Sequence, residues 1–193
     1  MALPPLSPLG GAVRVAYHGA MNEWDERFDY YRDSPAHAVG DDLDQVVAWC
    51  EVGPGVTALD VATGGGHVAR RLRELGAEVT TCDAAAGMQP DVVCPAEELA
   101  FEDGMFDVVV CRVAAHHFTD PGRAVREMAR VTRRLVVLED TLFVDDLVTQ
   151  AEKRRDPTHV LQYARDQLVA FLEAAGLDLR AETTFPRRHD IAD

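Results

Sequence analysis

The chain contains 193 residues, of which 47% are hydrophobic and 27% are charged, and its formal net charge is −14 at pH 7. These values are typical of a single globular domain with a sizeable core. The negative charge argues against nucleic acid as a partner, because binding to a phosphate backbone depends on clustered Lys and Arg. The sequence has neither a membrane-spanning apolar run nor a signal-peptide pattern, so we expect a cytoplasmic protein with no membrane partner.

Aromatic and turn-forming residues are concentrated at the start of the chain. We predict that residues 1–40 form a lid-like N-terminal segment and that residues 41–193 form one domain. Tyr17 and Tyr31 in this segment could line a substrate pocket. His159, much farther along the chain, is a third candidate for the same pocket.

The middle of the chain predicts an alternating α/β fold. A helix that begins at Asp41 carries apolar side chains at i, i+3, i+4 and i+7, and short apolar runs then alternate with amphipathic segments. We therefore expect a doubly wound, mostly parallel, Rossmann-like sheet. The predicted strands are 56–61, 78–82, 91–94, 106–111 and 135–139, and the predicted helices between them are 67–75 and 121–131.

The end of the chain carries one more helix signal and one more strand signal. Leu168, Phe171 and Leu172 share one helix face before Gly176, which is a favourable residue just after a helix. A strand-like run then covers residues 177–185.

A glycine-rich turn follows the first predicted strand, in the sequence LDVATGGGHVA of residues 59–69. Glycines at this junction let backbone amides approach a ligand at the helix N-terminus. The spacing of Gly64 and Gly66, with Asp83 at the end of the next strand to accept ribose hydroxyls, also fits a dinucleotide site. The turn therefore predicts a nucleotide-type cofactor.

Asp60 distinguishes between two classes of cofactor. A carboxylate at the end of the strand would repel a pyrophosphate, but it would suit a ligand that carries an ammonium and a sulfonium. Charge therefore favours S-adenosylmethionine over NAD. Two structural alternatives stay open: Asp60 could serve only to cap the turn, and the glycines could serve only close packing between strand and helix.

Several motifs occur in the order expected of one family. They are the glycine turn, CDAAAGM at 82–88, DGMFDVVVCRVAAHHFTDP at 103–121, REMARV at 126–131, RDPTHV at 155–160 and FLEAAGL at 171–177. Together they resemble the type 11 class I methyltransferases, the group that includes the ubiquinone and menaquinone C-methyltransferases. The resemblance covers most of residues 37–185.

The resemblance implies an S-adenosylmethionine site at the carboxyl edge of the sheet. The amino-acid end of the cofactor would lie against the glycine turn, the ribose hydroxyls on Asp83, and the adenine between Ala84 and Met88. The methionine part would lie along residues 112–114. The full predicted set is Asp60, Ala62, Thr63, Gly64, Gly66, His67, Asp83, Ala84, Met88, Ala96, Glu97, Arg112 and Ala114.

Four features depart from that family. No crossover helix fits between Met88 and Asp91, so we expect an irregular path or a displaced third strand. Pro95 stands where the family places an aspartate that accepts a hydrogen bond from adenine, and Arg133-Arg134 replaces a longer turn. The family's last, antiparallel strand is missing, which leaves a sheet edge that a second copy of the chain, as a homodimer, or a completing protein subunit could cover.

The chemistry of methyl transfer needs an aligned nucleophile and, for O, N or acidic C–H nucleophiles, a base. His117 is the first choice for the base and His116 the second, because both follow the fourth predicted strand. Alternatively, the pair could merely begin a short helix and pack under the cofactor. No motif predicts a metal site, and we expect the four cysteines to be ordinary buried thiols.

These observations predict an S-adenosylmethionine-dependent methyltransferase that acts on a small molecule, in a biosynthetic pathway. A methyltransferase-fold protein without transfer activity, which acts as a partner subunit or a pathway cyclase, is the alternative. An NAD-dependent oxidoreductase is the third hypothesis.

Overall fold

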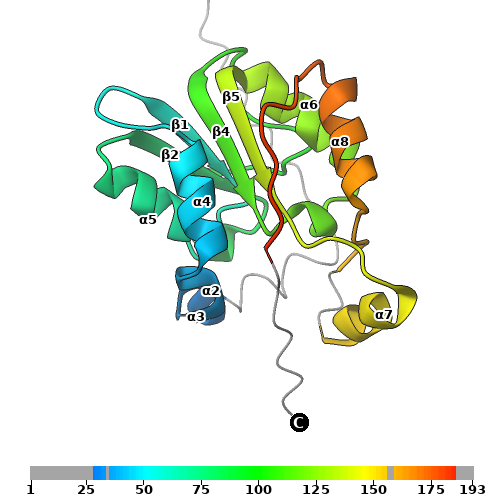
Figure 1. The fold of residues 1–193 in the computed structure, drawn as a ribbon. Coiled ribbons are helices and arrows are strands. Elements are labelled where there is room, and N and C mark those ends of the chain that lie inside the picture. The colour runs from blue at the N-terminus through cyan, green and yellow to red at the C-terminus, as the bar shows by residue number, and fades with distance from the viewer. Residues whose placement is uncertain (1–27, 34, 156–158, 186–193) are drawn as a thin grey trace, which may run out of the picture.

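The computed structural model describes residues 28–33, 35–155 and 159–185. These residues form a five-stranded parallel sheet in the order β3-β2-β1-β4-β5, with helices on both faces (Figure 1). The strands are β1 (Thr57–Val61), β2 (Glu78–Asp83), β3 (Val92–Val93), β4 (Phe106–Arg112) and β5 (Thr132–Glu139). The helices are α2 (Phe28–Asp33), α3 (Pro35–Ala38), α4 (Asp41–Trp49), α5 (His67–Glu74), α6 (Pro121–Val131), α7 (Asp146–Arg155) and α8 (Arg165–Ala174), with 3₁₀ turns η1 (Ala86–Met88) and η2 (Ala115–His117).

This strand order is that of a doubly wound sheet, as the sequence predicts. The chain moves outward from β1 to β3 and then returns to place β4 on the other side of β1, where Leu59 is paired with Thr80 of β2 and with Val109 of β4. Ligands of such sheets bind outside the carboxyl ends of the strands, at this switch point. Figure 1 shows α2, α3 and α7 beyond that edge of the sheet.

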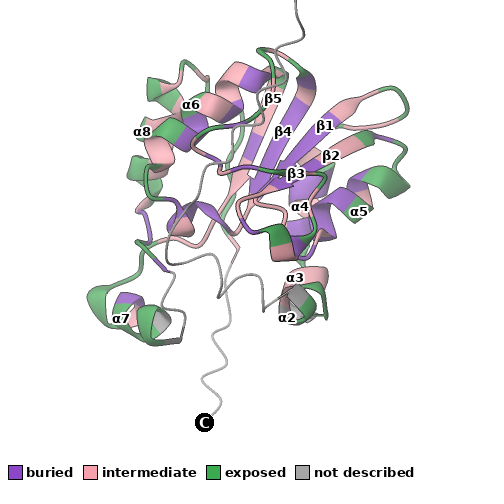
Figure 2. Ribbon diagram, turned by 180° about the vertical axis from the view of Figure 1, so that it is seen from behind, coloured by how far each residue is buried: buried purple, intermediate pink, exposed green. Residues whose placement is uncertain are grey.

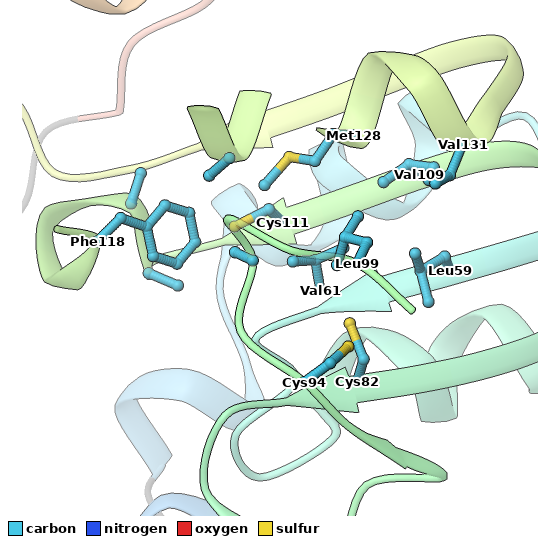
Figure 3. Close-up of a cluster of buried hydrophobic side chains, with 14 of the residues drawn as sticks. Leu59, Val61, Cys82, Cys94, Leu99, Val109, Cys111, Phe118, Met128 and Val131 are labelled. Atoms are coloured by element: carbon cyan, nitrogen blue, oxygen red, sulfur yellow. The ribbon is translucent and has the colours of Figure 1, made fainter. Parts of the chain in front are cut away.

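Alternating side chains of β4 divide the core into two layers. Val108 and Val110 pack with α4 and α5 on one face, while Val109 and Cys111 pack with Met128 of α6 on the other (Figure 3). Figure 2 shows β1 and β4 as the most deeply buried strands. The period-2 alternation of a strand and the single apolar face of each helix therefore account for both layers.

The link between β2 and β3 is irregular, in agreement with the missing crossover helix. Residues 84–91 contain only the η1 turn, and Gln89 at its end has a φ of 53°. The Asp91 carboxylate accepts hydrogen bonds from the backbone N–H of Thr81 (2.8 Å) and from its hydroxyl (2.9 Å). These bonds lower the pKa of Asp91 and hold the two-residue strand β3 beside β2.

The end of the chain corrects one prediction. Residues 177–185 do not form a strand: they are mostly exposed, with 44% of Leu179 accessible. Within the described part of the chain, no strand pairs with the outer edge of β5. Tyr17 and the rest of residues 1–27 lie outside the described residues. Of the helices that are described, none is long and apolar enough to cross a membrane.

Candidate functional site

A cavity of about 380 Å³ lies at the carboxyl ends of β1, β2 and β4. This volume falls within the range of roughly 300–1,000 Å³ that small-molecule and cofactor sites occupy. Gly66, His116 and His159 do not line it. The sequence-predicted residues that do are Tyr31, Asp60, Ala62, Thr63, Gly64, His67, Asp83, Ala84, Met88, Ala96, Glu97, Arg112, Ala114 and His117.

Asp60 organises the glycine turn from beneath. Its side chain is buried, and Oδ2 accepts hydrogen bonds from the Thr63 hydroxyl (2.7 Å) and from the backbone N–H of Ala69 (3.1 Å). Burial raises the pKa of Asp60 to about 6. The capping role that the sequence left open is therefore real, and the same carboxylate also lines the cavity.

Three residues of the turn have left-handed backbone conformations. Gly64 has a φ of 49° and Gly66 a φ of 72°, and Ala62 has a φ of 53° although it is not glycine. A methyl group on Gly64 would meet nothing within 4 Å, so this wall of the cavity stays open for a ligand. Gly66 instead serves as the N-cap residue of α5.

Asp83 joins the second strand to the glycine turn. One carboxylate oxygen accepts a hydrogen bond from the Gly64 N–H (3.0 Å), and the other accepts one from the Ala85 N–H (2.9 Å). Each carboxylate oxygen can accept a second hydrogen bond. Asp83 is thus held in place by the backbone at the edge of the glycine turn.

The segment before α4 closes one side of the cavity. His67 Nδ1 accepts a hydrogen bond from Arg70 (2.6 Å), so its Nε2 must donate to the carbonyl of Tyr31 (2.8 Å). Both ring nitrogens are therefore hydrogen-bonded within the protein, and His67 also lines the cavity. A Cβ on Gly65 would lie 2.6 Å from the same carbonyl, so this glycine permits the close approach of α2.

The wall predicted to face adenine is built differently from the family pattern. Pro95 lines the cavity beside Ala96. Glu97 also lines it, but its Oε1 accepts bonds from the Thr119 N–H and hydroxyl (both 2.9 Å) and from the Asp120 N–H (3.2 Å). Glu97 therefore fixes the start of α6 rather than offering that oxygen to a ligand.

Cys94 is the one cysteine among the described residues that lines this cavity. Figure 3 shows its sulfur beside that of Cys82. A hydrogen bond from Cys82 lowers the pKa of Cys94. Burial is the main cause that raises the pKa of Cys50, to about 12, and of Cys111.

The guanidinium of Arg112 is engaged by the protein. It donates to Asp42 from Nε (3.1 Å) and Nη2 (2.5 Å) and to the His37 carbonyl from Nη1 (3.1 Å), and it lies 3.7 Å from Glu139. The side chain lines the cavity, yet only 6% of it is exposed. Arg112 therefore ties the N-terminal helices to the sheet.

Three histidines cluster at one side of the cavity. The ring centroid of His116 lies 4.0 Å from that of His117 and 4.8 Å from that of His159, and only His117 lines the cavity. His116 is also bonded to Asp140 by Nδ1 (2.5 Å) and by its backbone N–H (2.7 Å). The sequence reasoning missed Asp140, although an acidic residue directly after the fifth strand was a usable signal.

The fold and the cavity together define an α/β protein with a nucleotide-type cofactor site. The family model described as a methyltransferase domain matches residues 59–138. BH2331 of Bacillus halodurans C-125, a solved structure assigned as a methyltransferase, is 30% identical with a TM-score of 0.66 and covers 74% of this chain and 71% of its own. The chain therefore belongs to the methyltransferase-domain family.

Two curated relatives agree with this assignment. YcgJ of Bacillus subtilis (strain 168), described as an uncharacterized methyltransferase, is 30% identical over 168 residues, which cover 76% of this chain and 66% of YcgJ. A demethylmenaquinone methyltransferase of Mycolicibacterium paratuberculosis is 37% identical over 99 residues. That match covers 46% of this chain and 43% of the relative, so the chain spans less than half of it.

The cofactor of this family is S-adenosylmethionine, and the charged residues that line the cavity suit it. Two carboxylates, Asp60 and Asp83, face the space where a ligand with two cationic groups and a ribose would lie. The open face of Gly64 leaves room beside them. On the adenine side, Pro95 has no side-chain acceptor, so it cannot supply the hydrogen bond to adenine that the resemblance implies.

Proposed function

We propose that this protein is an S-adenosylmethionine-dependent methyltransferase that acts on a small molecule in a biosynthetic pathway. The observation that carries the proposal is the pairing of Asp83 with the N–H of Gly64, which joins the ribose-binding carboxylate to the glycine turn. The name of the demethylmenaquinone relative supports a small-molecule acceptor. A cytoplasmic location remains part of the same proposal.

The residues of the site would divide the work as follows. Asp60 and the turn hold the amino-acid end of the cofactor, Asp83 holds its ribose hydroxyls, and Ala84 and Met88 flank the adenine. When bound, the cofactor supplies an electrophilic methyl group on a sulfonium. The protein then has to place the acceptor atom about 3–3.5 Å from that methyl and remove its proton. His117 and the histidines behind it are the groups placed for proton removal.

The test is transfer from labelled S-adenosylmethionine to an extract of host metabolites smaller than about 1 kDa. Formation of S-adenosylhomocysteine together with one labelled product supports the proposal. Binding of S-adenosylmethionine without any transfer favours the alternative of a partner subunit or pathway cyclase. Binding of NADH in place of S-adenosylmethionine would instead point to an oxidoreductase.

The unpaired edge of β5 supports a proposal about assembly. Within the described residues this edge has no neighbouring strand, and a second copy or a completing subunit could cover it. Native mass measurement of the purified chain and of complexes captured from the host tests this. A stable, active monomer contradicts it.

A further inference from the structure

Asp140 is a buried carboxylate that follows β5 and has a fixed set of donors. Only 1% of its side chain is exposed. Oδ1 accepts from His116 Nδ1 (2.5 Å) and from the backbone N–H of Thr141 (2.6 Å), while Oδ2 accepts from the backbone N–H of His116 (2.7 Å). Both carboxylate oxygens are therefore hydrogen-bonded to His116, one to its ring and one to its backbone N–H.

The hydrogen bond between Asp140 and Nδ1 determines where the proton of the His116 ring lies. A carboxylate can only accept a hydrogen bond, so Nδ1 of His116 must carry the proton that it shares with Asp140. In the neutral ring the lone pair is then on Nε2. A carboxylate that holds Nδ1–H of an imidazole in this way is how hydrolases prepare a histidine as a general base.

The dyad lies beside His117, which lines the cofactor cavity, and three segments of the chain build it. Besides η2 and the end of β5, the segment that contains His159 is fixed there, because the N–H groups of Val160 (3.0 Å) and Leu161 (3.2 Å) both donate to the carbonyl of His116. The rings of His117 and His159 then flank the ring of His116 at 4.0 and 4.8 Å. This arrangement brings the dyad next to His117, the histidine that lines the cavity.

We propose that Asp140 is a positioning residue that fixes His116 with its proton on Nδ1, so that Nε2 of His116 receives the proton of the acceptor while His117 contacts the bound molecules. This proposal rests on the proposed function, and it chooses between the two histidines. In the step itself, the acceptor O–H or C–H proton moves to Nε2 of His116 as the acceptor atom forms its bond to the methyl carbon. The carbon–sulfur bond breaks with its electron pair left on sulfur, and the imidazolium that forms is balanced by the Asp140 carboxylate.

Asp140→Asn is the diagnostic variant, because the amide keeps the shape of the side chain but presents N–H₂ or C=O in place of a second acceptor oxygen. Nitrogen-15 NMR of the histidine rings is measured on the full chain, with His116 assigned from the spectrum of His116→Gln. We expect protonated Nδ1 and unprotonated Nε2 in the wild type, and a shift of the proton toward Nε2 in Asp140→Asn. A wild-type His116 with its proton on Nε2 would overturn the proposal.

Activity provides the second readout, with 2-naphthol as the probe acceptor and S-adenosylhomocysteine as the measured product. We expect Asp140→Asn and His116→Gln to lower kcat by at least about a hundredfold, the lower range of general-base contributions. The Kd of S-adenosylmethionine should stay within about twofold, and Asp140→Glu should recover part of the rate. If the wild type does not methylate 2-naphthol, the position of the His116 ring proton, measured by nitrogen-15 NMR, decides whether the proposal stands.

The two levels of the proposal fail separately. If the wild type binds neither S-adenosylmethionine nor S-adenosylhomocysteine, the proposed function fails. If it binds both and the His116→Gln variant keeps the wild-type kcat while His117→Gln loses it, the assignment of the base to His116 is wrong and the proposed function stands.

Discussion

Arg112, at the carboxyl end of β4, is bonded through two nitrogen atoms to Asp42 in the first turn of α4. The guanidinium also bonds to the carbonyl of His37 and lies within ion-pair distance of Glu139. One side chain from the centre of the sheet thus holds the helices that border the cavity.

Replacement of Arg112 by Met should lower the free energy of unfolding by about 2–4 kcal/mol, because it strands carboxylates that are only 28% and 22% exposed. The measurement is urea unfolding at pH 7. Arg165→Met is the matched control: its pair with Glu182 is 53% exposed on both sides, so the loss of stability there should be much smaller. An equal loss of stability in the two variants would show that Arg112 does not hold the N-terminal helices against the sheet.

Asp60 should make stability depend on pH. Its pKa in the folded protein is raised from 3.8 to about 6 by burial, so the folded state holds this proton more tightly than the unfolded state. The contribution of Asp60 to stability therefore falls as pH rises from about 4 to 6, by up to roughly 3 kcal/mol. Asp60→Asn removes this loss, so the variant should gain stability relative to the wild type over that window. A stability difference independent of pH would contradict this.

Cys94 should be the most reactive thiol of the chain. Its pKa is lowered by the hydrogen bond from Cys82, and it lines the cavity, whereas burial raises the pKa of Cys50 and Cys111. Iodoacetamide at pH 7.5 should therefore label Cys94 first, as read by peptide mass spectrometry. S-adenosylhomocysteine should slow this labelling, and NADH should not. Unprotected labelling would place the ligand elsewhere.

Gly65→Ala should detach α2 from the glycine turn. The added methyl group would lie 2.6 Å from the Tyr31 carbonyl, which is backbone and cannot move aside cheaply. Trypsin should then cut faster after Arg32, and binding of S-adenosylmethionine should weaken. Gly53→Ala is the control, because its methyl group would meet nothing within 4 Å. Unchanged proteolysis of Gly65→Ala would show that the Tyr31 contact is dispensable.

The sequence predicted those features that depend on neighbours along the chain. The strands β1 and β4 were visible because buried parallel strands are almost entirely apolar, and the turn after Asp60 was visible because left-handed positions favour glycine. The link from β2 to β3 was correctly expected to be irregular, since residues 84–91 are too few for a crossover helix.

Features that depend on distant partners could not be predicted in the same way. Asp42 and Arg112 are 70 residues apart, and Asp140 reaches back 24 residues to His116. The run from 177 to 185 has strand-like composition, but a strand also needs a partner for its backbone groups, and the described part of the chain supplies none there. The hydrogen-bond partners of His67, which are Arg70 and the Tyr31 carbonyl, likewise become apparent only after folding.

Calorimetric titration with S-adenosylmethionine and S-adenosylhomocysteine tests the central claim most directly. The wild type should bind both, and Asp83→Ala should weaken both by at least about 10–100-fold, because the ribose would lose the charged acceptor that the N–H groups of Gly64 and Ala85 hold in place. Asp178→Ala, at an exposed position far along the chain, should bind as the wild type does. No heat with either ligand, or equal affinity in Asp83→Ala and the wild type, would contradict the assignment of this cavity as the cofactor site.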